Sequence, residues 1–135
     1  MALPAAAKVL VVDGDKNSLE VTHALLLKEG YRVEKACRLR EAFQFLQREK
    51  MDVLIIDVEM PEMKSYEAIP LIKGIDPKLP IIMTAEENSP ELESQVRHHG
   101  VFYYHLKSFG FEELKLAVEN AIKKSSVSDS VSGKM

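Results

Sequence analysis

Four residues with complementary chemistry follow short apolar runs in this chain. Asp13 follows KVLVV, Asp57 follows VLII, Thr84 follows PIIM and Lys107 follows YYHL. Two carboxylates with backbone oxygens nearby suit Mg²⁺, which prefers a few hard oxygen ligands and keeps water in the rest of its shell. An ammonium and a metal beside a carboxylate neutralise a phosphoryl group in transfer, a reaction that depends mainly on positioning and on charge neutralisation. If the fold brings them together, these residue types predict phosphoryl chemistry on a carboxylate.

The apolar runs predict the elements that would position these residues. A short unbroken run such as Val53 to Ile56 is typical of a strand buried on both faces of a parallel sheet, and Pro61 stops further pairing. Five strand and helix alternations specify an α/β fold, a doubly wound parallel sheet with right-handed crossovers. The carboxyl ends of parallel strands share one edge, where ligands bind. The predicted strands are 8–12, 31–36, 53–56, 79–83 and 101–106, and the predicted helices are 17–29, 39–48, 67–73, 90–98 and 111–122.

One predicted helix contains a residue that opposes it. Pro70 lies within 67–73, where its ring crowds the preceding turn and its nitrogen has no hydrogen to donate. We therefore expect this helix to be short or to begin late.

Length, charge and composition limit the class of protein. A chain of 135 residues forms one domain, and its net charge of −3, without a Lys/Arg cluster, predicts no direct contact with nucleic acid. No apolar run approaches the roughly 20 residues that span a bilayer, the start of the chain has no signal-peptide pattern, and Cys37 has no partner for an internal disulfide. These features indicate a cytoplasmic protein without a membrane segment. We expect a domain over residues 1–124 and a Ser-rich disordered tail or truncated linker over residues 125–135.

The motifs VLVVDGD, VLIIDVEMPEM, PIIMTA and YYHLKSF resemble those of response-regulator receiver domains, at the family's spacing and over about Lys8 to Lys123. The resemblance implies a flavodoxin-like fold with five strands in the order 2-1-3-4-5. It also implies that Asp57 accepts a phosphoryl group from a histidine kinase or phosphotransfer protein. Such a protein is a signalling switch that assists its own phosphotransfer and dephosphorylation, and is not a conventional enzyme. Its other partner would be a downstream effector protein or an output domain missing from the C-terminal side.

The resemblance implies a Mg²⁺ site formed by Asp13, Asp57 and the main-chain carbonyl of Glu59. Family members usually carry a second acid directly after the first one, where this chain has Gly14. Because the affinity of such a site rests on few charges, we expect Mg²⁺ to bind weakly. Asp15 is a candidate compensating acid, but its shift of one residue along the loop favours a role as the cap of the first helix. The side chain of Glu59 is the other candidate.

The resemblance also implies the parts of a switch. Lys107 would contact the phosphoryl group, Thr84 would donate a hydrogen bond to it, and Tyr104 would follow by changing rotamer. This local charge change would remodel the surface of the last two helices and the last strand for a partner. Ser65 and Ser108 stand where the family usually has glycine and proline. Without that proline we expect a trans Lys107–Ser108 bond, since a cis non-proline bond costs about 3 kcal/mol.

Two other functions are compatible with parts of the sequence. A degenerate receiver would have lost phosphorylation, as Gly14 and Ser108 suggest, and would act as a constitutive protein-interaction module. VLVVDGDK also fits the nucleophile strand of haloacid-dehalogenase-type phosphatases, with Asp13 as nucleophile and Asp15 as general acid. That hypothesis lacks the later pair of acids at another strand end and leaves the Asp57 strand unexplained.

Overall fold

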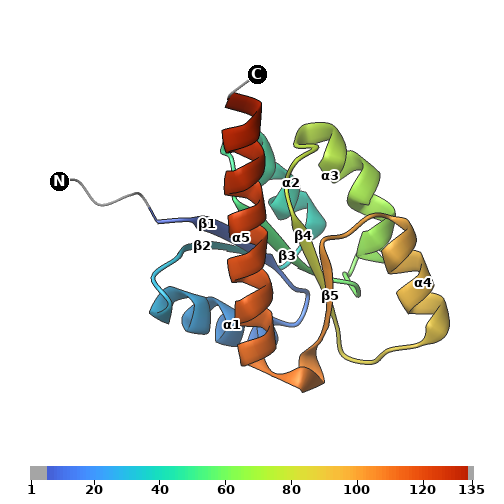
Figure 1. Cartoon of the computed structure of the whole chain (residues 1–135). Helices are drawn as coiled ribbons and strands as arrows, with labels where there is room; N and C mark the ends of the chain where they lie inside the picture. The colour runs from blue at the N-terminus through green and yellow to red at the C-terminus, as the bar shows by residue number, and fades with distance from the viewer. Residues whose placement is uncertain (1–5, 134–135) are drawn as a thin grey trace.

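The protein is a twisted parallel sheet with helices on both faces (Figure 1). The structure is a computed structural model that describes residues 6–133, with side chains described up to residue 125. The sheet has the order β2-β1-β3-β4-β5, which confirms the predicted flavodoxin-like fold. The strands are β1 (Lys8–Val12), β2 (Arg32–Ala36), β3 (Val53–Asp57), β4 (Ile81–Ala85) and β5 (Tyr103–Leu106).

Five α-helices cover the sheet, two on one face and three on the other. The side chains of α1 and α5 share one apolar core, and those of α2, α3 and α4 share the second. Short 3₁₀ turns at Ser65–Ala68 and Lys107–Phe109 precede α3 and α5. The helices are α1 (Lys16–Lys28), α2 (Leu39–Arg48), α3 (Ile69–Ile75), α4 (Pro90–His98) and α5 (Phe111–Gly133).

The central strand β3 supplies both cores, because successive side chains of a strand point to opposite faces. Leu54 and Ile56 lie in the core beneath α2, α3 and α4, while Val53 and Ile55 lie beneath α1 and α5. All four are essentially removed from solvent. A strand buried on both faces needs an unbroken apolar run, which explains why β3 was recognisable in the sequence.

The strand register brings polar residues to the same edge of the sheet. Asp57, the last residue of β3, pairs directly with Thr84 of β4, and Thr84 pairs with His105 of β5. Asp13 follows β1, whose pairing with β3 ends at Val12. Lys107 follows β5 in the same way. The four strand ends therefore present their side chains to one common region.

Two local predictions about helix starts are confirmed. Asp15 is the N-cap of α1, and its carboxylate accepts hydrogen bonds from the backbone N–H groups of Asn17 and Ser18 at 3.0 and 3.3 Å. The third helix begins at Ile69, later than its apolar pattern, and carries Pro70 in its first turn. Proline is tolerated there because the N–H that it lacks would have no partner within the helix.

Helix α5 reaches into the segment for which a disordered tail or truncated linker is expected, and that expectation stays a prediction. The structure continues α5 as a helix through Gly133, and residues 134–135 lie outside the described residues. No proline or glycine interrupts residues 125–132, and serine lowers helix propensity only slightly once the preceding turns have formed. Neither α5 nor any other helix within residues 6–133 is long and apolar enough to cross a membrane. A domain boundary at residue 124 stays a prediction.

Asp15→Ala is expected to lower the free energy of unfolding by about 1 kcal/mol, because two backbone donors at the start of α1 lose their acceptor. Urea denaturation measures this change. Asp15→Asn is the matched control, since asparagine also caps helices, and it should stay close to the parent protein. An equal loss of stability in both variants would show that the negative charge of Asp15, and not its hydrogen bonds as the N-cap, stabilises the start of α1.

Candidate functional site

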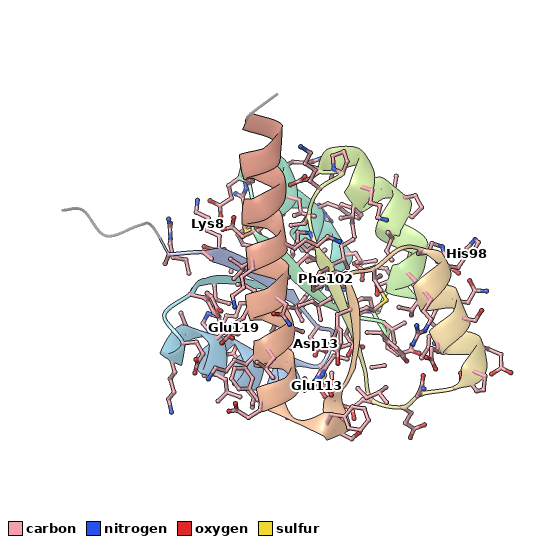
Figure 2. All side chains as sticks on the ribbon, viewed as in Figure 1. Lys8, Asp13, His98, Phe102, Glu113 and Glu119 are labelled. Atoms are coloured by element: carbon pink, nitrogen blue, oxygen red, sulfur yellow. The ribbon has the colours of Figure 1, made fainter. Side chains whose placement is uncertain are left out.

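An ammonium group joins two carboxylates at the carboxyl edge of the sheet. The Nζ atom of Lys107 lies 2.8 Å from Asp13 Oδ2 and 2.8 Å from Asp57 Oδ2. Thr84 Oγ1 donates a hydrogen bond to the same Oδ2 atom of Asp57 at 3.1 Å. Figure 2 labels Asp13, which lies in the loop between β1 and α1. The structure thus brings together the four strand-end residues that the sequence singled out.

Asp57 is held at several points by its own loop. Its side chain is buried, the residue being 4% exposed, and its Oδ1 atom accepts a hydrogen bond from the backbone N–H of Glu59 at 2.8 Å. The hydroxyl of Ser65 donates to the main-chain carbonyl of Asp57 at 2.6 Å. Oδ1 is therefore fixed by the backbone, and Oδ2 is the oxygen that faces Lys107 and Thr84.

Burial controls the protonation of this site. Burial raises the pKa of the Asp57 carboxyl above its ordinary value, although Lys107 and the Glu59 N–H act in the opposite direction. Burial alone lowers the pKa of Lys107, but its hydrogen bonds to Asp13 and Asp57 outweigh this effect and the pKa stands above its usual value. Lys107 consequently remains charged at neutral pH and is the cation that the two buried acids share.

The position of Lys107 does not depend on a proline. The described residues contain no cis peptide bond, so the expectation of a trans Lys107–Ser108 bond is confirmed. Lys107 opens a 3₁₀ turn that ends at Gly110, whose φ of 87° lies in the region that glycine adopts without strain. The two carboxylates and this turn together orient the side chain of Lys107.

The residues nearest Asp13 determine how well the site fits Mg²⁺. Asp15 uses its carboxylate as the cap of α1, and the side chain of Glu59 forms an ion pair with Lys64. Within the described chain, no group of three or more His, Cys, Asp or Glu side chains is arranged to hold a metal. Two carboxylates and a backbone carbonyl are a minimal set for Mg²⁺, which tolerates several water ligands. Asp13, Asp57 and the Glu59 carbonyl offer oxygen atoms of the kind that Mg²⁺ prefers, and weak binding by these three groups stays a prediction.

Gly14 lies close to the loop that follows β3. A Cβ atom at Gly14 would stand 3.0 Å from Pro61 Cδ and 3.7 Å from the carbonyl oxygen of Glu59. A side chain at this position would therefore point toward the expected metal ligands, after a small shift of the proline ring. An acid at position 14 would therefore begin beside Pro61 and the Glu59 carbonyl.

Three polar contacts near the site were not apparent from the sequence. The hydroxyl of Tyr104 donates to Asn88 Oδ1 at 2.9 Å. His105 is 3% exposed, and its Nδ1 atom lies 2.8 Å from Glu113 Oε1 (Figure 2 labels Glu113). Ser65, which the sequence marked only as a departure from glycine, donates to the main-chain carbonyl of Asp57 in β3. Each contact joins residues that no local pattern relates.

The geometry agrees with a comparison to known proteins. A model of the response regulator receiver domain matches residues 9–119. The chain belongs to this family. Receiver domains are signalling switches that are phosphorylated on an aspartate and bind Mg²⁺ at the acidic phosphorylation site. Response regulators interact with histidine kinases and phosphotransfer proteins and carry output domains.

Individual relatives extend the comparison. The two-component response regulator ARR10 of Arabidopsis thaliana is 32% identical over 124 residues, which are 90% of this chain and 22% of ARR10. The chain therefore spans about a fifth of the length of this curated relative. The Vibrio cholerae chemotaxis protein CheY4 superposes with a TM-score of 0.80 at 32% identity, covering 87% of this chain and 99% of CheY4. The beryllofluoride-activated receiver domain of NtrC4 gives a TM-score of 0.81 at 27% identity, covering 87% of this chain and 98% of that domain.

Asp57→Asn is expected to stabilise the metal-free protein at neutral pH. A folded-state pKa above the unfolded value means that folding favours the protonated carboxyl, so stability is lost as pH rises from the unfolded pKa through the folded one. The Asp57→Asn variant has no carboxyl at this position and does not lose this stability. Its gain in free energy of unfolding over the parent protein should vanish below the ordinary aspartate pKa of about 3.9. Urea denaturation at both pH values, without Mg²⁺, measures the difference.

The control for this pH experiment is Asp76→Asn, in which asparagine retains the acceptor oxygen that Asp76 Oδ1 offers to the Lys78 N–H. It should change stability little at either pH. An Asp57→Asn variant less stable than the parent at neutral pH would contradict the expected cost of the buried charge.

Gly14→Asp is expected to tighten Mg²⁺ binding, because it adds a carboxylate beside the Glu59 carbonyl. Gly14→Asn has the same shape without the charge and is the matched control. Both variants should lose about 1 kcal/mol of stability through contact with Pro61, and the aspartate variant should recover more stability than the asparagine variant as Mg²⁺ is titrated. Thermal denaturation across a Mg²⁺ series measures both effects. Equal Mg²⁺ affinity in all three proteins would show that position 14 does not reach the metal.

Proposed function

We propose that Asp57 of this receiver domain is the phosphoacceptor. The observation that supports the proposal is the double contact of Asp57 Oδ2, which lies 2.8 Å from Lys107 Nζ and 3.1 Å from Thr84 Oγ1. A phosphoryl group on this oxygen would meet a fixed cation and a hydroxyl donor from two neighbouring strand ends. Both groups favour the negative charge that such a transfer brings to the site.

The proposed transfer begins with attack of Asp57 Oδ2 on the phosphorus of a phosphohistidine. The new oxygen–phosphorus bond forms as the nitrogen–phosphorus bond breaks, and the histidine keeps that electron pair. Lys107 then contacts a phosphoryl oxygen in place of the Asp57 carboxylate, and its ion pair with Asp13 remains. Thr84 donates its hydrogen bond to another phosphoryl oxygen. Mg²⁺, when bound by Asp13, Asp57 and the Glu59 carbonyl, adds further positive charge at this point.

The proposed partners follow from the family. The donor is a histidine kinase or a phosphotransfer protein, and the recipient of the signal is an effector protein or an output domain outside this segment. We propose no direct contact of this segment with nucleic acid or with a membrane. We place the protein in the cytoplasm, where such donors meet their receivers.

A degenerate receiver is the second candidate function. The observation that favours it is the depleted metal site, since Gly14 offers no ligand and the side chains of Asp15 and Glu59 are engaged elsewhere. A phosphatase of the haloacid dehalogenase type is disfavoured, because Asp15 caps a helix and Lys107 holds the Oδ2 atom of Asp13. In the degenerate alternative, the unmodified domain would bind its partner constitutively.

Phosphorylation of Asp57 is testable with small donors. Incubation with acetyl phosphate or phosphoramidate and Mg²⁺ should add one phosphoryl mass, measured on the intact protein by mass spectrometry. Asp57→Asn should abolish the added mass, because an amide cannot form the acyl phosphate. Lys107→Ala should slow its appearance by at least tenfold, since the transferred charge loses its fixed cation.

Asp76→Asn serves as the control for loss of a carboxylate outside the site and should be modified like the parent protein. If no donor adds the phosphoryl mass over a wide Mg²⁺ range, the degenerate alternative is supported. Added mass that survives in Asp57→Asn would move the acceptor to another residue.

A further inference from the structure

A histidine and a glutamate join β5 to the start of α5, on either side of Lys107. The Nδ1 atom of His105 lies 2.8 Å from the Oε1 atom of Glu113, a residue eight positions further along the chain. His105 belongs to β5, and Glu113 lies in the first turn of α5, where Figure 2 labels it. The contact therefore closes a loop that contains the whole turn on which Lys107 lies.

The histidine end of this contact is fixed by the sheet. His105 is buried, and it pairs directly with Thr84 of β4. Thr84 in turn pairs with Asp57 of β3, so these three residues form one row across the sheet. The position of His105 is thus set by the same strand pairing that places the proposed phosphoacceptor.

The glutamate end of the contact is oriented by its helix and by β5. The free N–H groups at the start of a helix favour an acidic side chain in the first turn, where Glu113 lies. A carboxylate only accepts hydrogen bonds, so the Nδ1 atom of His105 carries the hydrogen and donates it. Burial raises the pKa of the Tyr103 hydroxyl, and the Glu113 carboxylate acts in the same direction. Because Tyr103 and His105 lie on the same face of β5, the Glu113 carboxylate faces that strand.

The turn between these two residues has a conformational freedom that its own sequence does not remove. Residues 106–112 contain no proline, whose ring would fix a φ angle, and Gly110 separates the turn from α5. Glycine has the widest choice of backbone conformations. A backbone hydrogen bond from the Gly110 N–H to the Lys107 carbonyl closes the turn at 3.1 Å, but it does not tie the turn to α5. A contact that spans both the turn and the glycine restricts the two together.

We propose that His105 and Glu113 are positioning residues that hold the turn on which Lys107 lies, and so place its ammonium group for phosphoryl transfer to Asp57. The inference rests on the proposed function of Asp57 and adds two residues to it. Lys107 Nζ lies 2.8 Å from Asp57 Oδ2, the oxygen proposed to form the new bond, so this partner of Lys107 changes during transfer. The contact between His105 and Glu113 involves no reacting atom and stays in place throughout. Small displacements of a group that acts on the reacting atoms cost large factors in rate.

The experiment follows the phosphoryl mass that acetyl phosphate and Mg²⁺ add to the protein with time. Glu113→Ala should slow its appearance by about three- to fivefold, the factor that corresponds to one partly exposed hydrogen bond. Glu113→Gln keeps an acceptor oxygen and should restore most of the rate. His105→Leu keeps a side chain of similar size without the donor and should slow the reaction like Glu113→Ala. The double variant should be no slower, because either substitution alone already removes the contact.

Glu112→Ala is the matched control, because Glu112 is exposed and is also an acidic residue of the first turn of α5. It removes the same charge from the same helix end and leaves the contact of His105 with Glu113 intact, so it should react at the parent rate. Tyr103→Phe should also react at the parent rate, since the proposed partner of Glu113 is His105. Slowing by either control equal to that of Glu113→Ala would overturn the inference.

A second readout separates this inference from the proposed function. Two carboxylates hold the Lys107 ammonium group, whose side chain is 20% exposed, so we expect its hydrogens to exchange slowly with water. NMR of the ¹⁵N-labelled protein without Mg²⁺ measures this exchange, and the Lys107 signal is assigned by its loss in Lys107→Ala. Glu113→Ala and His105→Leu should speed the exchange, and Glu112→Ala should leave it unchanged.

The two readouts fail for different reasons. If the parent protein gains no phosphoryl mass, the proposed function fails, whereas the exchange of the Lys107 ammonium hydrogens still decides the role of His105 and Glu113. A contact that only stabilises the fold would lower the free energy of unfolding of Glu113→Ala and leave this exchange as in the parent protein. That result would overturn the inference.

Discussion

Two buried carboxylates, Asp13 and Asp57, share one ammonium group, and the geometry of the whole site depends on this arrangement. Without Lys107, two acids at 5% and 4% exposure would lie together with no cation among the contacts of the described chain. Burial of unpaired charge is among the most costly events in a folded protein. The site is tolerable because Lys107 arrives from the end of β5, although burial still raises the pKa of Asp57 above its ordinary value. The same cation is well placed to receive a phosphoryl group.

The sheet is what makes this arrangement possible. Parallel strands in the order β2-β1-β3-β4-β5 end at one edge, and the direct pairing of Asp57 with Thr84 fixes their separation. The loop after β3 is then tied back by the Ser65 hydroxyl and by the ion pair of Glu59 with Lys64. These contacts hold the backbone at Asp57 and the loop that follows it. They also commit the Glu59 side chain, which would otherwise be available to replace the acid missing at Gly14.

A charge change at Asp57 has a physical route to the surface. Thr84 contacts the acceptor, Tyr104 pairs beside that segment in the sheet, and Asn88 connects the tyrosine to α4. Each step is a single contact between neighbouring side chains or strands. The energy involved at each is that of one hydrogen bond, which suits a switch that must respond to one phosphoryl group.

Local signals in the sequence were sufficient for the elements and for the residues that end them. The apolar run of β3, the cap at Asp15 and the late helix start at Pro70 each depend on interactions within a few residues, so they were predictable. The double contact of Lys107 was decided by the tertiary structure, since it joins residues 94 positions apart through strand register and packing. The same holds for the bond from Tyr104 to Asn88. Side chains from separate elements meet according to how those elements pack, and no short-range pattern encodes that geometry.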